Sequence, residues 1–155
     1  MILVLDASAA VRAVLKAPES EKILDMAANA RIVTAPDLFI AEITNAIWKH
    51  WKFDNLPLQD CYDSIERASQ LVTELAPTSE MNIEALDVAR QTGTTVYDAM
   101  YLVTARRLAA SLLTLDKKLA AAAKSMSIIT PADVWTMESH PTMARKTKRR
   151  GDVKP

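Results

Sequence analysis

Glycine is scarce in this sequence, since Gly93 and Gly151 are the only two among 155 residues. A loop that cradles phosphate groups needs several glycines, because the backbone must approach its ligand closely. The sequence contains neither a G-x-G-x-x-G fingerprint nor a P-loop. This excludes the usual glycine-rich sites for dinucleotides and nucleoside triphosphates.

Cysteine and histidine are also scarce, being limited to Cys61, His50 and His140. One cysteine cannot form an intramolecular disulfide, and these three residues lack the spacing of a Cys/His zinc site. No apolar run approaches the roughly 18 residues that a membrane-spanning helix needs, and the first residues lack the basic and apolar regions of a signal peptide. We therefore expect a cytoplasmic protein that makes no membrane contact.

Charge of one sign does not dominate, because 19 basic residues balance 19 acidic ones, and the overall charge indicates no polyanionic partner. The distribution is uneven: residues 141–155 contain six Lys or Arg and one acid, which leaves 13 basic and 18 acidic residues before them. With 50% apolar and 25% charged positions, the composition is typical of one globular domain. We expect that domain at residues 1–140, followed by a basic, disordered tail at residues 141–155.

Short apolar runs alternate along the chain with longer segments of helical periodicity. The apolar runs predict strands at residues 2–5, 31–34, 112–115 and 127–129. Helical spacing and the prolines predict helices at residues 8–16, 19–30, 37–53, 57–72, 79–92, 95–108, 116–124 and 131–137. This alternation predicts an α/β fold with helical layers around a mainly parallel sheet.

Two aspartates, Asp6 and Asp116, directly follow predicted strands. Ligands of parallel sheets collect beyond the carboxyl ends of the strands, so these two carboxylates would emerge at the same edge if their strands are neighbours. Each aspartate taken alone is more simply interpreted as a helix N-cap, whose carboxylate accepts hydrogen bonds from the first turn.

Two further acids lie within predicted helices. Asp98 falls on the apolar face of its helix, on the side of Leu102, and a carboxylate there needs a partner. A capping box with Thr95 as the N-cap is the structural alternative. Glu42 shows the opposite pattern, because it shares a polar helix face with Lys49, and periodicity alone predicts that it is exposed to solvent.

Four carboxylates in one cleft would repel each other by about 4 kcal/mol for a pair 4 Å apart, at an effective dielectric constant near 20. Such a cleft must protonate or bind cations. Carboxylate oxygens suit Mg²⁺ or Mn²⁺, and a site of this kind can activate a water for phosphodiester cleavage. The sequence contains no serine, cysteine or histidine nucleophile motif, so metal-assisted hydrolysis is the reaction that it favours.

Four short motifs in this order and at this spacing resemble those of a known family. They are Leu5-Asp6-Ala7-Ser8, Ala41-Glu42-Ile43-Thr44-Asn45-Ala46, Tyr97-Asp98-Ala99-Met100-Tyr101 and Leu113-Thr114-Leu115-Asp116. Over residues 1–137 the chain resembles the PIN-domain ribonucleases, and within them the compact VapC-like toxins of bacterial and archaeal toxin–antitoxin modules. The resemblance implies a Rossmann-like α/β/α sandwich and RNA cleavage that depends on Mg²⁺ or Mn²⁺.

The resemblance also implies roles for individual residues. Asp6, Glu42 and Asp98 correspond to the three acids most regularly found at the metal site, and Asp116 corresponds to the less uniform fourth. Ser8 and Thr114 match positions near the acids, where a hydroxyl could hold a carboxylate or a metal-bound water. The basic tail is not part of the family pattern, but clustered Lys and Arg could grip RNA phosphates. The candidate RNA-binding residues are Lys49, Arg145, Lys146, Lys148, Arg149 and Arg150.

The family further implies partners. A toxic nuclease needs restraint, which a small VapB-like antitoxin would provide by packing its C-terminal segment beside the acidic cleft, and the family also suggests homodimers. The region of Ile47, Trp48 and Trp51 and the helix at residues 8–16 are the candidate contact surfaces. The aromatics could instead stack on single-stranded RNA, but we expect Trp51 to pack in the core while Lys49 and Lys52 face water.

Other functional classes remain as alternatives. A PIN fold could bind RNA or protein without cutting, although the presence of all four acids argues against this. A phosphoacceptor signalling domain would need acids grouped beside Asp6, where residues 7, 9 and 10 are alanine. An isolated structural module would bind no metal.

Overall fold

A four-stranded parallel sheet forms the centre of the computed structural model, which describes residues 1–131. Its strand order is β3-β2-β1-β4, and every neighbouring pair is parallel. The predicted mainly parallel sheet is therefore confirmed. The strands are β1 (Ile2–Leu5), β2 (Ile32–Pro36), β3 (Glu74–Ala76) and β4 (Ser111–Leu113).

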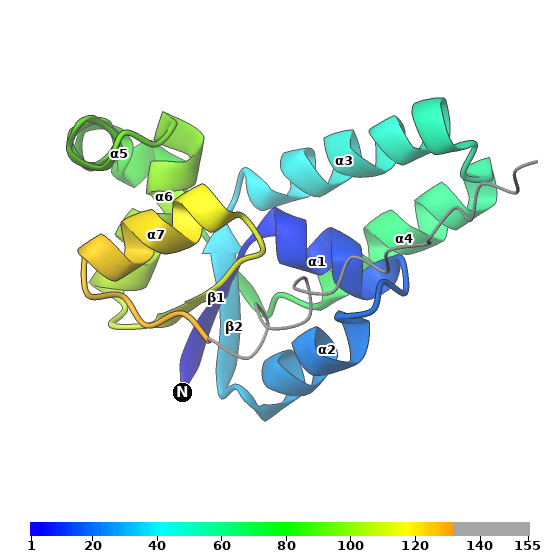
Figure 1. Ribbon diagram of the computed structural model, residues 1–155, viewed down its shortest axis with the longest axis horizontal. Coiled ribbons are helices and arrows are strands. Elements are labelled where there is room, and N and C mark those ends of the chain that lie inside the picture. Colours follow the sequence, from blue (N-terminus) through cyan, green and yellow to red (C-terminus); the bar gives the residue numbers. More distant parts are fainter. Residues whose placement is uncertain (132–155) are drawn as a thin grey trace, which may run out of the picture.

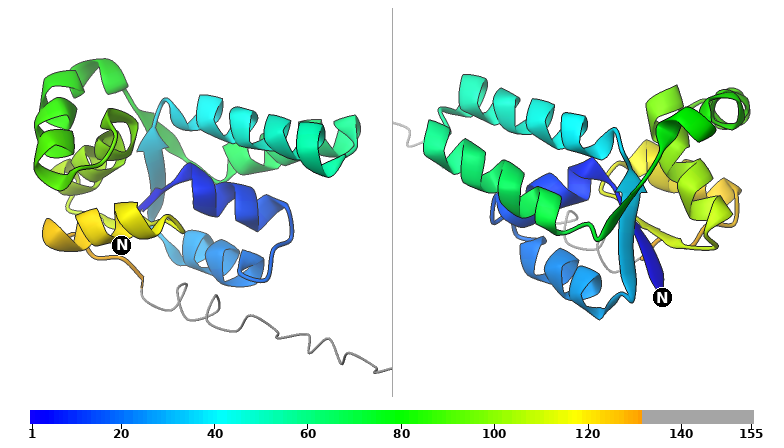
Figure 2. Two further views of the ribbon diagram at one scale, coloured as in Figure 1. Left: turned by 45° about the horizontal axis from the view of Figure 1, so that its top comes forward. Right: turned by 180° about the vertical axis from the view of Figure 1, so that it is seen from behind.

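Helices cover both faces of this sheet (Figures 1 and 2). The four helices of the first half of the chain lie on one side, and the last three lie on the other. This arrangement confirms the predicted α/β/α sandwich. The helices are α1 (Ala7–Val14), α2 (Ser20–Asn29), α3 (Phe39–Asp54), α4 (Leu58–Gln70), α5 (Asn82–Thr92), α6 (Val96–Arg107) and α7 (Lys117–Ser125), with a 3₁₀ turn at Thr78–Glu80. None of the helices in residues 1–131 has the length and hydropathy needed to cross a membrane.

The core lies where β1 and α6 meet. β1 pairs with a strand on each side, so its apolar residues are buried against helices on both faces, as parallel strands require. Leu3, Val4 and Leu5 are fully buried, and so is the large side chain of Tyr101 on α6. The apolar run that predicts a strand at residues 2–5 is thus also the centre of the hydrophobic core.

Residues in the left-handed backbone conformation end two of the helices. Asn55, which ends α3, has a φ of 56°, and Gly93, which ends α5, has a φ of 71°. Left-handed residues close helices by directing the chain away from the axis, and asparagine and glycine tolerate that conformation best. Pro57 directly precedes α4, where its missing N–H costs no hydrogen bond.

The sheet differs from the prediction in two places. Residues 127–129 do not form a strand, because Ser127 has a φ of 58° and the Leu112 N–H to the Ile129 carbonyl is the one backbone bond between this segment and β4. The edge strand β3 was not predicted, because its three residues contain no apolar run and are mostly exposed. Three predictions lie outside the described residues: the helix at residues 131–137 beyond its first residue, the domain boundary at residue 140 and the basic tail at residues 141–155.

The prediction that Trp51 packs in the core is also wrong, since 46% of its surface is exposed. Figures 1 and 2 show the reason: α3 and α4 run side by side past the sheet, so the far half of α3 has no strand beneath it. The helical spacing of apolar residues continues there, but part of the apolar face remains open to solvent.

Candidate functional site

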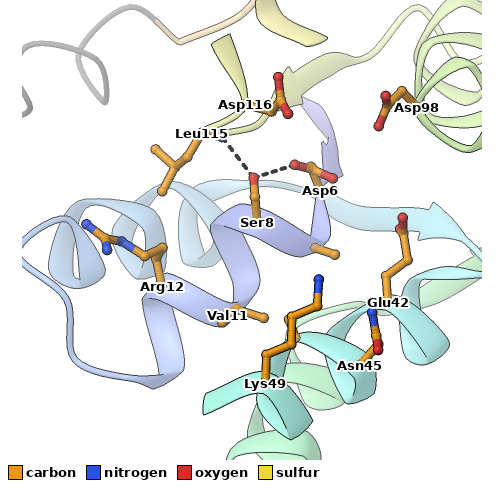
Figure 3. A pocket seen from close by; sticks show the side chains of 12 residues that line it. Asp6, Ser8, Val11, Arg12, Glu42, Asn45, Lys49, Asp98, Leu115 and Asp116 are labelled. Carbon is orange, nitrogen blue, oxygen red and sulfur yellow. Dashed lines mark hydrogen bonds between the residues drawn. The ribbon is translucent and has the colours of Figure 1, made fainter. Parts of the chain in front are cut away.

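Four acids converge on one open cavity of about 480 Å³ at the carboxyl edge of the sheet. Because β1 and β4 are direct neighbours, the residues that follow them emerge together, as predicted. Helices α3 and α6, one from each layer, supply the other two carboxylates (Figure 3). The acids are Asp6 after β1, Glu42 on α3, Asp98 on α6 and Asp116 after β4.

Asp6 is the most buried of the four, with 7% of its surface exposed. Its Oδ2 accepts hydrogen bonds from the Ser8 hydroxyl and, at 2.7 Å, from the Thr114 hydroxyl. Burial raises the pKa of this carboxyl, the two hydroxyls oppose that rise, and the charge of Asp98 adds to it. Asp6 is the N-cap residue of α1, as predicted, but its side chain makes no capping bond; the carboxylate faces the hydroxyls instead of the first turn.

The hydroxyls of Ser8 and Thr114 connect the two strand ends. The Ser8 Oγ accepts the Leu115 N–H at 3.1 Å, and the Thr114 Oγ1 accepts the Asp116 N–H at 3.0 Å. Both hydroxyls also donate to Asp6. They fix this carboxylate while its second oxygen points toward the space between Asp98 and Glu42 (Figure 3).

Asp98 lies in the first turn of α6, where it is half-buried. Thr95 is the N-cap, as the structural alternative predicts: its hydroxyl accepts the Asp98 N–H at 3.1 Å and donates to the Asp98 Oδ2 at 2.8 Å. The cap fixes the side chain without removing it from the cavity, because Asp98 still lines the wall opposite Glu42 (Figure 3).

Asp116 is both a helix N-cap and an acid at the cavity, which are the two interpretations that its sequence position allowed. Its Oδ1 accepts the N–H groups of Lys118 and Leu119 at 2.7 and 3.0 Å, which makes it the N-cap of α7. It is also part of the cavity wall. One carboxylate oxygen is thus committed to the helix, and the side chain is exposed to solvent.

Glu42 is not a solvated surface residue, contrary to the prediction from periodicity. It is half-buried, and its Oε2 accepts a 2.5 Å hydrogen bond from the Tyr101 hydroxyl. Burial raises the pKa of Glu42 to about 7; the Tyr101 bond lowers it, and the charges of Asp6 and Asp98 raise it. These effects place the carboxyl close to its titration midpoint at neutral pH.

Tyr101 is the residue that sequence reasoning missed. Burial strongly raises the pKa of its hydroxyl, so it remains a hydrogen-bond donor to Glu42. The available signal was its position three residues after Asp98, on the same face of α6. Its partner lies 59 residues away in the sequence, which no helical pattern indicates.

Replacing Tyr101 with phenylalanine is expected to leave Glu42 without its donor. The loss should cost about 1–3 kcal/mol of unfolding free energy at pH 8, where Glu42 is charged, and less at pH 5, where it is protonated. Urea titrations of the metal-free protein at both pH values measure this. Tyr97→Phe, on an exposed tyrosine of the same helix, is the matched control. Equal losses at pH 5 and pH 8 would contradict a role through the Glu42 charge.

Two basic side chains line the same cavity. Arg12 forms an ion pair of 3.0 Å with the buried Glu19, so its charge is already balanced. Lys49 is exposed and directs its ammonium group into the cavity (Figure 3). The remaining candidate RNA-binding residues, Arg145, Lys146, Lys148, Arg149 and Arg150, lie outside the described residues.

The acids fit a hydrated divalent cation better than a closed cage of protein ligands. Within residues 1–131, no three Asp, Glu, His or Cys side chains lie close enough to hold one ion together. Mg²⁺ usually keeps several waters and takes one or two carboxylates directly, which suits acids that face each other across an open cavity. The charges of Asp6 and Asp98 raise the pKa of Glu42, and a positive ion between these carboxylates would relieve their repulsion.

Comparisons with known proteins agree on the fold and the family. The family model described as the PIN domain matches residues 3–125. The chain is 31% identical over 133 residues to Ribonuclease VapC3 of Pyrobaculum aerophilum, an alignment that covers 84% of this chain and all of that protein. The crystal structure of PAE2754 from Pyrobaculum aerophilum has the same fold, with a TM-score of 0.66 and 23% identity over 88% of this chain and 86% of that one.

Proposed function

The chain belongs to the PIN domain family and is VapC-like within it, and from this premise we propose that it is an endoribonuclease that hydrolyses RNA phosphodiester bonds with Mg²⁺ or Mn²⁺. The observation that carries the proposal is the convergence of four carboxylates, from two strand ends and two helices, on one cavity. Similarity to a protein named as a ribonuclease supports the same reaction.

Each acid has a proposed place in this reaction. Asp6, Glu42, Asp98 and Asp116 would hold a hydrated cation, some of them through its waters, and the cation when bound would lower the pKa of a water and stabilise the leaving oxygen. The chain's other groups orient these carboxylates. Ser8 and Thr114 fix Asp6, and Tyr101 fixes Glu42. Lys49 lies at the same cavity, where its ammonium group would attract an RNA phosphate and partly offset the repulsion from the acids.

Cleavage of a mixed pool of single-stranded and structured RNAs by the purified protein tests the proposal. We expect products with Mg²⁺ or Mn²⁺ and none with EDTA. No cleavage with either ion, together with no Mn²⁺ binding by calorimetry, would contradict it. The alternative of a non-cutting PIN module that binds RNA or protein would then be favoured.

We further propose that the protein is the toxin of a toxin–antitoxin pair in the cytoplasm, and that a VapB-like antitoxin binds the outer face of α3 and α4. An almost wholly apolar groove of about 260 Å³ lies between these helices. Trp48 and Trp51 line it and are 45% and 46% exposed, and so does Tyr62, which is 57% exposed. Exposed aromatics around an apolar groove are typical of a protein interface.

Replacing Trp51 with alanine is expected to weaken binding of the proposed VapB-like antitoxin by about 2 kcal/mol or more, because buried tryptophans dominate interfaces. Isothermal calorimetry measures the change, which corresponds to roughly thirtyfold in Kd. Leu86→Ala is the control, because Leu86 is 57% exposed but lies on α5 in the other layer. Unchanged affinity in Trp51→Ala would remove this groove from the interface.

We also propose that the protein forms a homodimer. Light scattering after size exclusion measures it directly, with a mass near twice 17.1 kDa expected. A monomer at high micromolar concentration would contradict it.

A further inference from the structure

A second cavity adjoins the acidic one. It has a volume of about 620 Å³ and lies between the loop that follows α5 and one face of α7. Asp98 and Asp116 line both cavities. These two acids therefore form the boundary between them, and a flexible ligand held at the acidic cavity can continue across that boundary into the second.

The second cavity has a different chemical lining. Apart from the two shared aspartates it contains no acid, and Lys118 supplies one positive charge. Neutral groups that can form hydrogen bonds make up much of the remaining wall, among them Gln91, Thr94 and Ser125. A phosphate is repelled by the four acids but attracted by Lys118, whereas the amide and hydroxyls suit the neutral polar edge of a base.

Thr94 offers a hydrogen-bond acceptor for the edge of a base. The Thr92 hydroxyl donates its hydrogen to the Val88 carbonyl at 2.8 Å, so the 2.9 Å contact between Thr92 and Thr94 requires Thr94 to be the donor. The Thr94 oxygen then presents acceptor lone pairs. Gly93, with a φ of 71°, sets the turn that places this hydroxyl in the cavity wall. An acceptor in a fixed position suits an N–H group on a base.

We propose that this second cavity binds the nucleotide adjoining the scissile phosphate, with Lys118 contacting its phosphate and Thr94 and Gln91 contacting its base. The proposal rests on the ribonuclease activity proposed above. The RNA strand then passes from the acidic cavity between Asp98 and Asp116 toward α7. The strand must be unpaired there, because base edges in an RNA duplex are poorly accessible to side chains.

The phosphate contact is tested with Lys118→Gln. In cleavage of a fluorescent single-stranded RNA 12-mer of randomised sequence with Mg²⁺, we expect KM to rise about 3- to 10-fold and the slope of log KM against log salt to fall by about one. Lys124→Gln removes the same charge from the far end of the same helix, at a residue that lines neither cavity. Its KM should change less than twofold.

The base contact is tested with Thr94→Val and Gln91→Ala. Sequencing of the products from a random RNA pool gives the base preference at each position around the cut. We expect each variant to lower the preference at one adjoining position about fivefold or more, without changing preferences on the other side of the cut. A general loss of folding would lower cleavage at all sites equally and would not redistribute them.

The outcomes separate the two proposals. If the wild-type protein cuts RNA but Lys118→Gln behaves as Lys124→Gln does, and neither base-contact variant moves the preference, the second cavity is not a nucleotide site while the nuclease proposal stands. If the wild-type protein neither binds nor cuts the 12-mer with Mg²⁺ or Mn²⁺, both proposals are wrong.

Discussion

Replacing Asp6 with asparagine is expected to lower the rate of RNA cleavage in Mg²⁺ by about a thousandfold or more. A cation at a phosphodiester stabilises the transition state by several kcal/mol, and each 1.36 kcal/mol corresponds to about tenfold in rate. Asp6 is the only one of the four acids that is buried and the one held by two hydroxyls. Loss of its charge should therefore weaken cation binding more than loss at an exposed acid.

The Asp6→Asn variant is expected to fold, which makes the result interpretable. The amide oxygen of asparagine can still accept the hydrogen bonds from Ser8 and Thr114, and the neutral side chain avoids the burial cost that raises the pKa of Asp6. Asp25→Asn, at an exposed aspartate on α2, removes the same charge away from the cavity. A rate for Asp6→Asn within threefold of that control would show that Asp6 does not hold the cation.

Replacing Asp116 should lower the rate of RNA cleavage less than replacing Asp6. Its Oδ1 already accepts two backbone N–H groups of α7, so one oxygen is left for a cation or its waters. This arrangement gives a physical reason to expect that Asp116 is the least essential of the four acids.

The parts of the site that sequence predicted best are those fixed by the sheet. Asp6 and Asp116 each follow a strand of the sheet, and adjacent parallel strands end at one edge, so their meeting follows once β1 and β4 are neighbours. The N-cap of α6 could also be predicted from the sequence, because Thr95 and Asp98 are three residues apart. These relations are either local or follow from a general rule of parallel sheets.

The parts that sequence could not predict depend on contacts between layers. Glu42 belongs to the polar face of α3, yet Tyr101 from α6 in the opposite layer covers it at the edge of the sheet. Trp51 has helical spacing appropriate to the core, but α3 extends past the sheet, so the residue is exposed. Periodicity describes which face of a helix is apolar; it does not describe where the neighbouring layer ends.

The metal-free protein is expected to lose stability as the pH rises from about 5 to about 7.5. Glu42 has its pKa raised from 4.5 to about 7; the folded state therefore holds the proton more tightly than the unfolded state, and its contribution is lost as the pH passes through the folded pKa. Because Glu42 is only half-buried, solvent screening should limit the loss to about 1–2 kcal/mol. The raised pKa of Asp6 acts in the same direction.

The two acids with lowered pKa values, Glu19 and Glu84, do not mask this effect, because they titrate in a lower pH range. Glu19 and Glu84 have pKa values below 4.5, and each is paired with arginine. Their contributions are lost only as the pH falls through those lowered values, and they are complete above about pH 5. Urea unfolding in EDTA between pH 5 and 7.5 therefore does not include the contributions of these two acids.

Adding Mg²⁺ or Mn²⁺ is expected to reverse the loss of stability that the metal-free protein shows as the pH rises. A cation that binds only the folded protein adds about 2.7 kcal/mol at a hundred times its Kd, and it binds best when the carboxylates are ionised, so the gain should grow with pH. Glu42→Gln should flatten the pH dependence in EDTA, because it removes the titrating group while the amide oxygen can still accept the Tyr101 bond. If stability in EDTA does not change from pH 5 to 7.5, or if both ions stabilise the protein equally at those two pH values, the four acids do not act as one electrostatically coupled cation site.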